Sequence, residues 1–381
     1  MSASIARVGM DAAVQEQSAP AIDVAPKAIA AWLFDSGAQS IIEPHRGGVA
    51  GWIDADGRAE YVYPEITGYY LQWLAWIAIC DGVSTRLAQR AAMSQRWLAA
   101  WIRRTDPPET RVYLHGHVDD WRNQALFAFD LAMVLRGIAS AARTGLIDPD
   151  EALVRNIAAQ LSQLIASDGM FDSCRANPAS ASLPDRWSTR RGGFLAKAAA
   201  GVISASEVLP ISAALQKAAA ATMTTSLDAA VGQPHDEAHP ALYAIEGALV
   251  LPDRRAVAPL LPALTNQIDM LLTHAAAHDG WLLESRGMAG VERLDVVAQA
   301  LRAAVLLRAR CVDWSPDPQA LEKMRQLLVR YITPAGSLAL APRAPSPQYN
   351  VWCAMFAEQA LQVSGPAVPH SRLYDLEAYL V

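Results

Sequence analysis

The acidic residues at two points of the chain have the clearest potential for chemistry. Asp119 and Asp120 follow His117 in HGHVDDWRN, and Glu65 stands directly after a proline in YVYPEITGYY, before a long apolar run. Two carboxylates on either side of a sugar can act as acid and as base or nucleophile. We therefore predict that Glu65 and Asp120 form such a pair, supported by Asp119 and His117. The alternative for one of the two aspartates is to cap a helix.

Glu246 is a further catalytic candidate, because it stands within the apolar segment YAIEGALVL. A lone buried carboxylate is costly, so Glu246 should have a partner or a raised pKa. The candidate partners are Arg302, Arg293 and Tyr243. A catalytic acid and a structural ion pair are both open interpretations.

Candidate binding residues gather in the segments that precede apolar helices. Aromatic rings there can stack on sugars, although packing in the core is their commoner role. Arginines beside a helix N-terminus can hold a carboxylate or phosphate, with a solvated loop flank as the alternative. The predicted substrate-binding residues are Trp52, Tyr69, Trp121, Arg122, Asp185, Arg186, Trp187, His239, Tyr243, Asp295, Asn350 and Trp352. For Asp295 and Asn350 the alternative is a structural role at a helix N-terminus.

Two groups of residues have the types that bind a divalent ion: His115, His117 and Asp119, and His235, Asp236 and His239. Neither has the spacing of a defined zinc motif, and the four cysteines share no metal-like spacing either. We predict no metal and no cofactor.

Helices must position these residues, because apolar residues recur with a helical period along most of the chain. Four segments are amphipathic, as in an outer layer: 84–104, 148–165, 256–277 and 317–333. Six segments are apolar nearly all round and should be buried: 64–80, 119–142, 192–208, 240–251, 292–307 and 347–362. The two kinds alternate.

The apolar segments also recur at a regular interval. Glu65 and Asp120 are 55 positions apart, as are Asp295 and Asn350. Glycines follow amphipathic segments in SDGMF, HDGWL and PAGSL, where positive φ is expected at a helix C-terminus. A period near fifty residues built from helix pairs indicates a repeat architecture. Six such pairs closed into a ring would bury all six apolar helices.

This pattern resembles the α/α-toroid superfamily, which includes six-hairpin glycosidases, polysaccharide lyases, sugar epimerases and terpenoid cyclases. The resemblance covers about residues 27–362, and GGVAGW, YPEITGYY, YAIEG and NVWCAMFAEQAL are similar to segments of bacterial toroid proteins that make polysaccharides or specialised metabolites. It implies an all-α (α/α)6 toroid of six inner and six outer helices, with short strands or loops at the mouth. We expect one catalytic domain over residues 27–381, after a flexible tail over residues 1–26.

The resemblance also implies an enzyme, and three functions remain open. The leading one is a carbohydrate-active enzyme that hydrolyses, eliminates or epimerises a glycoside or a uronic-acid-containing sugar, which the loop arginines would suit. The second is a terpenoid-cyclase-like enzyme with Asp119 and Asp120 as proton donor, although His117 stands where that family's Asp-any-Asp-Asp motif has its first aspartate. The third is a non-catalytic, ligand-binding toroid.

Composition excludes several classes of protein. The chain of 381 residues is 52% hydrophobic and 18% charged, which excludes a disordered protein. Its net charge is −6 and its arginines are scattered, so no nucleic-acid partner is predicted. It lacks both a membrane-spanning segment and a secretory signal, so we expect a cytoplasmic protein with a small-molecule or oligosaccharide substrate. The sequence leaves the oligomeric state open.

Overall fold

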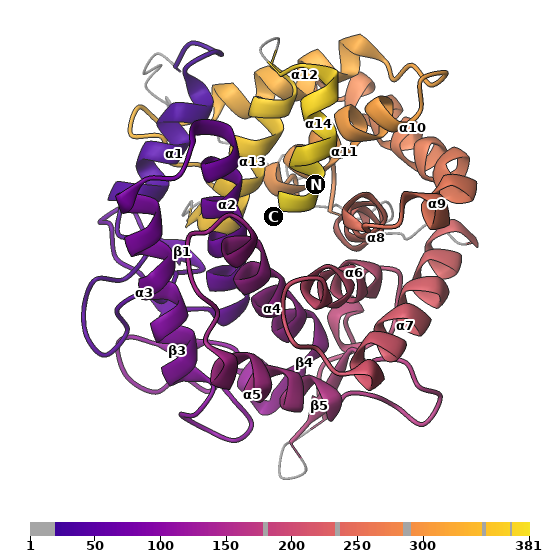
Figure 1. Cartoon of the computed structure of the whole chain (residues 1–381). Helices are drawn as coiled ribbons and strands as arrows, with labels where there is room; N and C mark the ends of the chain where they lie inside the picture. The colour runs from indigo at the N-terminus through magenta and orange to yellow at the C-terminus, as the bar shows by residue number, and fades with distance from the viewer. Residues whose placement is uncertain (1–19, 178–181, 233–236, 285–290, 345–347, 366–367) are drawn as a thin grey trace, which may run out of the picture.

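Two concentric rings of helices make up the protein, as Figure 1 shows for this computed structural model. The structure describes residues 20–177, 182–232, 237–284, 291–344, 348–365 and 368–381. The predicted all-α toroid is confirmed. The inner ring consists of α2 (Pro64–Asp81), α4 (Ala128–Arg143), α6 (Leu195–Ser206), α8 (Ala238–Val250), α11 (Leu294–Arg310) and α13 (Val351–Val363). Each inner helix contacts the next, and α13 returns to α2 to close the ring.

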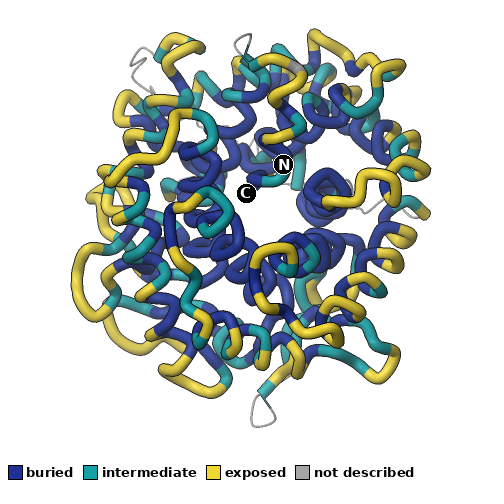
Figure 2. The backbone as a smooth tube through the Cα atoms, viewed as in Figure 1, coloured by how far each residue is buried: buried dark blue, intermediate teal, exposed yellow. Residues whose placement is uncertain are grey.

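The outer helices alternate with the inner ones along the chain. They are α1 (Ala25–Asp35), α3 (Thr85–Trp101), α5 (Glu151–Ser162), α7 (Ala213–Gly232), α10 (Leu261–Ala277) and α12 (Pro318–Arg330). Figure 2 shows the inner helices buried nearly all round and the outer helices exposed on one side. The charge pattern did not predict α1 or α7, because both are rich in alanine and carry few charges. No helix within the described ranges is long and apolar enough to cross a membrane.

Short strands lie just before several inner helices. β1 (Trp52–Ile53) pairs with β6 (Tyr349–Asn350), β2 (Tyr61–Val62) with β3 (Val112–Tyr113), and β4 (Ala125–Phe127) with β5 (Cys174–Ala176), all antiparallel. The strands β2, β4 and β6 lead directly into α2, α4 and α13. They therefore fix the chain at the mouth of the ring, where the inner helices begin.

The helix predicted over 119–142 begins later than expected. Residues Trp121–Gln124 form a 3-10 helix, η1, and the strand β4 follows before α4 starts at Ala128. Asp120 caps η1, since its Oδ1 accepts a hydrogen bond of 3.0 Å from the main-chain N–H of Arg122. Glu65 and Asp120, which are 55 positions apart, therefore do not occupy equivalent positions of two inner helices. The acidic residue in the first turn of α4 is Asp130.

Glycines bring α2 and α4 into direct main-chain contact. A Cβ atom at Gly68 would lie 2.6 Å from the carbonyl oxygen of Met133, and Gly137 lies in turn against the backbone of Gly68. Both inner helices begin at the mouth, so they run in the same direction. Three residues before Gly68 is Glu65, and three residues before Met133 is Asp130. The close contact thus places these two carboxylates at the same level of the ring.

The remaining short helices are α9 (Arg254–Val257), η2 (Trp187–Thr189), η3 (Ala258–Leu260), α14 (His370–Leu376) and η4 (Glu377–Tyr379). The helix η4 contacts the inner helices α2 and α8. After η4 the chain turns to the centre of the ring, where Val381 is fully buried (Figure 1). The main-chain oxygen of Val381 accepts a hydrogen bond of 3.0 Å from Lys197 Nζ, and its N–H donates to Gln359. The predicted positive φ is confirmed at Gly169, Gly280 and Gly336.

Candidate active site

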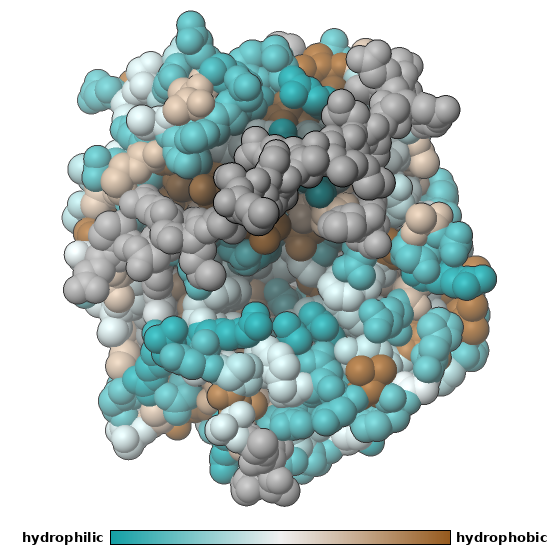
Figure 3. Space-filling view, turned by 180° about the vertical axis from the view of Figure 1, so that it is seen from behind, coloured by the Kyte–Doolittle hydropathy of each residue, from teal (hydrophilic) through white to brown (hydrophobic). Residues whose placement is uncertain are grey.

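A cavity of about 240 Å³ lies among the first turns of the inner helices and the strands before them. Seen from the side opposite to Figure 1, the surface is hollowed near its centre (Figure 3). The cavity wall contains two buried carboxylates, Glu65 and Asp130, and four arginines, Arg111, Arg122, Arg186 and Arg293. Its aromatic residues are Tyr63, Trp121, Phe127, Phe129, Trp187, Phe194, Tyr243 and Trp352. This combination of charges and aromatic rings suits a polar ligand with at least one apolar face.

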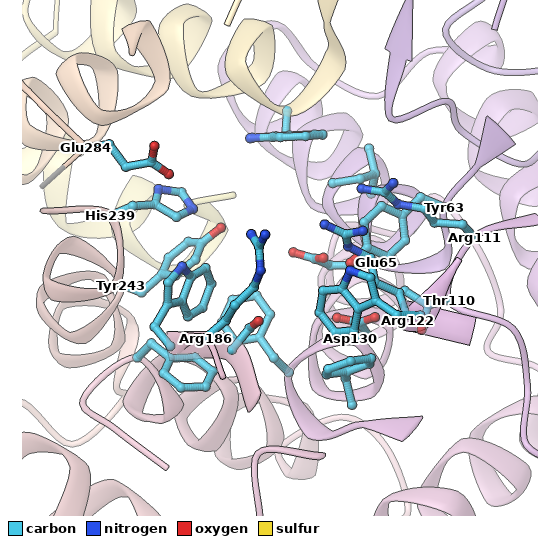
Figure 4. A pocket seen from close by; sticks show the side chains of 18 of the residues that line it. Tyr63, Glu65, Thr110, Arg111, Arg122, Asp130, Arg186, His239, Tyr243 and Glu284 are labelled. Carbon is cyan, nitrogen blue, oxygen red and sulfur yellow. The ribbon is translucent and has the colours of Figure 1, made fainter. Parts of the chain in front are cut away.

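Glu65 and Asp130 form the carboxylate pair of this cavity. Both are 8% exposed, and both lie in the first turn of their helices, α2 and α4. Figure 4 shows the two side chains on the same side of the cavity, beside Tyr63. Within the described chain Glu65 makes no ion pair, and the buried Oδ2 of Asp130 has no hydrogen-bond partner. These two acids are therefore not neutralised by structural contacts.

The environment makes both carboxyl groups hold protons more tightly than usual. Burial raises the pKa of Asp130 well above its ordinary value, and the nearby charge of Glu65 raises it further. Burial also raises the pKa of Glu65, although hydrogen bonds from Tyr63 and Tyr69 and the charges of Lys197 and Arg111 oppose the rise. The negative charge of one carboxylate therefore disfavours ionisation of the other, and the effect is larger on Asp130.

Asp120 lies outside the cavity wall, contrary to its predicted place opposite Glu65. Its carboxylate accepts from Arg111 Nη1 at 3.2 Å, from Arg122 Nη1 at 3.1 Å and from the Tyr113 hydroxyl at 3.0 Å. Burial alone would raise the pKa of Asp120, but the Arg122 main-chain hydrogen bond and the two arginine charges bring it below the ordinary value. Asp120 is thus an ionised support that holds Arg111 and Arg122 at the cavity.

The other predicted catalytic residues also lie away from the cavity wall. His117 and Asp119 are exposed, and Asp119 accepts a hydrogen bond of 3.1 Å from Gln124. Glu246 is fully buried below the cavity, where Lys197 donates to it at 2.8 Å and Arg302 Nε at 2.9 Å. For Glu246 the structural ion pair is therefore the interpretation that its contacts support.

Seven of the predicted binding residues line the cavity: Trp121, Arg122, Arg186, Trp187, His239, Tyr243 and Trp352. They come from loops, from the short helices η1 and η2, from the first two turns of α8 and from the first turn of α13. Figure 4 shows Arg186 directed toward the centre, with His239 and Tyr243 on the wall across from Glu65. Segments that are far apart in the sequence therefore meet at one cavity.

The other five predicted binding residues have structural contacts outside the cavity wall. Trp52 packs edge-on against Tyr61, and Asp185 pairs with Arg190 on the surface at 2.8 Å. Tyr69 is buried, with its hydroxyl 3.3 Å from that of Tyr243.

Asp295 and Asn350 take the structural roles that were the alternatives for them. Asp295 is fully buried and pairs with Arg293 Nη2 at 2.6 Å. It also accepts from the indole of Trp352 at 3.3 Å, which orients that ring at the cavity wall. Asn350 caps α13 by accepting from the main-chain N–H of Cys353 at 2.8 Å.

Asp130, Arg111 and Tyr63 line the cavity but were not among the predicted site residues. Asp130 had a usable signal, because it is an acid inside the apolar segment FAFDLAM, the same signal that singled out Glu246. Arg111 carried none, since the pairing of β2 with β3 brings it to the mouth. Among the described residues no cluster of three or more His, Cys, Asp or Glu could hold a metal. His235 and Asp236 lie outside the described residues.

Comparison with solved structures gives the same fold with low sequence identity. A D-mannose isomerase superposes with a TM-score of 0.66 at 13% identity, over 90% of this chain and 96% of that one. An unsaturated glucuronyl hydrolase specific for heparin gives 0.58 at 12% identity, over 90% and 97%. A type II terpene cyclase from Scytonema, in complex with its product merosterolic acid A, gives 0.56 at 14% identity, over 91% and 98%.

These similarities define the chain as an α/α toroid. The sequence matches no family model and no curated protein.

Proposed function

We propose that this protein is a carbohydrate-active enzyme that uses Glu65 and Asp130 as its acid and base. The observation that carries the proposal is the pair itself: two buried carboxyl groups with raised pKa values that line one cavity at the mouth of the ring. Perturbed acids in a cleft are typical of catalytic sites. Asp130 would donate a proton to the leaving oxygen or ring, and Glu65 would act as base or nucleophile. The sugar-processing isomerase and hydrolase of similar fold support this class of reaction.

A sugar with a carboxylate is the substrate that the cavity suits best. Arg111 and Arg122 are paired with Asp120, and Arg293 is paired with Asp295. Arg186 makes no ion pair with any described residue, and Figure 4 shows its guanidinium directed into the cavity. A planar guanidinium binds a carboxylate through two parallel hydrogen bonds. We therefore propose a glycoside or free sugar that contains a uronic acid.

Replacement of Glu65 by glutamine tests the proposed function. We expect the wild-type protein to convert at least one member of a panel of 4-nitrophenyl glycosides, unsaturated uronyl disaccharides and free uronates, followed by absorbance and by proton NMR. Glu65→Gln should lose roughly 10²- to 10⁴-fold in kcat, because an ionisable group in the transition state is removed. A wild-type protein inert toward the whole panel, or a fully active Glu65→Gln variant, would contradict the proposal.

Replacement of Arg186 by alanine tests the acidic substrate. The variant should raise KM for a uronate-containing substrate roughly 10- to 100-fold, as expected for the loss of a charge-assisted hydrogen bond of about 1.5–3 kcal/mol, with little change in kcat. Arg190→Ala is the matched control, since Arg190 is exposed and pairs with Asp185 outside the cavity wall. Equal effects of the two substitutions would show that Arg186 does not bind the substrate.

The aromatic rings near Asp130 favour terpenoid cyclisation as a second candidate. Phe129 and Phe127 share the cavity wall with Asp130, whose proton could start such a reaction. The predicted donors of that reaction, Asp119 and Asp120, lie outside this wall, and four arginines line it. Sugar chemistry is therefore the first choice. Conversion of geranylgeranyl or farnesyl substrates by the wild type, with no conversion of any sugar, would reverse the order.

A further inference from the structure

His239 is joined to the buried Glu246 by the side chain of Gln299. His239 lines the cavity, whereas Gln299 and Glu246 are fully buried beneath it. Gln299 Nε2 lies 3.2 Å from Glu246 Oε2, and Gln299 Oε1 lies 2.6 Å from His239 Nδ1. A continuous line of hydrogen-bonding groups thus runs from the buried ion pairs up to the cavity wall.

The orientation of Gln299 follows from the ionised state of Glu246. Burial would raise the pKa of Glu246, but Arg302 and Lys197 bring it below the ordinary value, so it is a carboxylate that can only accept hydrogen bonds. Gln299 must therefore turn its amide nitrogen toward Glu246 and its oxygen toward His239. An amide oxygen can only accept, so His239 Nδ1 must carry the hydrogen. The reverse orientation would place two acceptors against each other in a buried site.

The other charged groups around His239 are compatible with this arrangement. Asp295 Oδ2 lies 3.8 Å from Nδ1, but both its oxygens already accept from Arg293, and they also accept from the main chain of Val296 and the indole of Trp352. Burial lowers the pKa of His239 to about 4 despite the opposing charge of Asp295, with Arg293 lowering it further. The imidazole is therefore neutral above about pH 5, and a neutral imidazole carries one hydrogen only.

We propose that Gln299 and Glu246 are positioning residues that hold His239 in its Nδ1–H tautomer. Nε2 is then the unprotonated nitrogen on the opposite edge of the ring, which faces the cavity and accepts a hydrogen bond from a bound ligand. Under the proposed function, on which this last step rests, the donor is a sugar hydroxyl. The tautomer itself depends only on the buried contacts, and it can be measured without a substrate.

Long-range proton–nitrogen NMR of the protein labelled with 15N-histidine tests the tautomer. The signals of His239 are assigned by their loss in His239→Asn. Between pH 6 and 8 we expect one protonated Nδ1 and one unprotonated Nε2. A protonated Nε2, an equal mixture of tautomers, or a charged ring would overturn the proposal. This result is independent of activity, so it stands or falls separately from the enzymatic function.

Substitution of Gln299 by methionine tests whether Gln299 fixes the tautomer of His239. Methionine keeps the length of the side chain and removes both hydrogen-bonding groups, so the Nε2–H tautomer of His239 should become the major form. Gln359→Met is the matched control, because Gln359 is an equally buried glutamine that contacts Arg302 and Val381 but has no hydrogen bond to His239. An unchanged His239 spectrum in Gln299→Met would overturn the role of Gln299 and indicate that Asp295 fixes the tautomer. If Gln299→Met does not fold, the wild-type spectrum still decides the tautomer.

Discussion

Asp130→Asn should abolish turnover while the protein stays folded. Asparagine has nearly the same shape as aspartate but cannot release a proton, so we expect kcat to fall roughly 10²- to 10⁴-fold. The measurement is kcat on whichever substrate the wild type converts, beside thermal unfolding of both proteins. Asp119→Asn provides the control, because Asp119 is exposed and should leave activity at the wild-type level.

The same variant should also change how stability depends on pH. The pKa of Asp130 is higher in the folded protein than in the unfolded chain, so its contribution to stability is complete below its ordinary value and is lost as pH rises through the folded pKa. The Tm of the wild type should therefore fall between pH 5 and pH 9 more than that of Asp130→Asn. Wild-type turnover in Asp130→Asn, or identical pH profiles of Tm, would remove Asp130 from the site.

Glu246→Leu should cause the largest loss of stability among the variants considered. Glu246 is the carboxylate that neutralises Lys197 and Arg302, and all three side chains are fully buried. Removing one partner of a buried ion pair leaves the other charge uncompensated, at a cost of about 3–5 kcal/mol. Urea unfolding followed by circular dichroism measures the loss.

The exposed pair Glu151–Arg155 supplies the comparison for that measurement. Its two groups are 3.1 Å apart on the outer helix α5, where water screens the attraction. Glu151→Ala should leave the urea midpoint unchanged. A loss in Glu246→Leu no greater than in Glu151→Ala would mean that the buried cluster contributes little to folding.

The fold could be predicted from the sequence because a ring of helix pairs leaves a strong local signal. Segments such as 64–80 have no polar face, and a helix of this kind needs neighbours on every side. A closed inner ring covered by outer helices supplies them. Two further features indicate the repeat independently. One is the regular interval between the later helix pairs, and the other is the glycines, which have positive φ.

The second carboxylate of the site was predicted wrongly because the start of α4 depends on contacts between residues distant in sequence. In DDWRNQALFAFD the aspartates look like a helix cap, and Asp120 does cap the short η1. The helix α4 begins only after strand β4, which pairs with β5, some fifty residues further along the chain. The local sequence does not indicate that pairing. The carboxylate predicted to face Glu65 was therefore assigned to Asp120 instead of Asp130.

The glycines that join α2 and α4 have a consequence for stereochemistry. Gly68 and Gly137 bear no functional group, but any side chain at Gly68 would press on the backbone of Met133 and force the two helices apart. In glycoside hydrolases the gap between the two carboxyl groups decides whether the anomeric configuration is retained or inverted. If the substrate is a glycoside, these two glycines help to set the distance between the carboxyl groups of Glu65 and Asp130, and through it the configuration of the product.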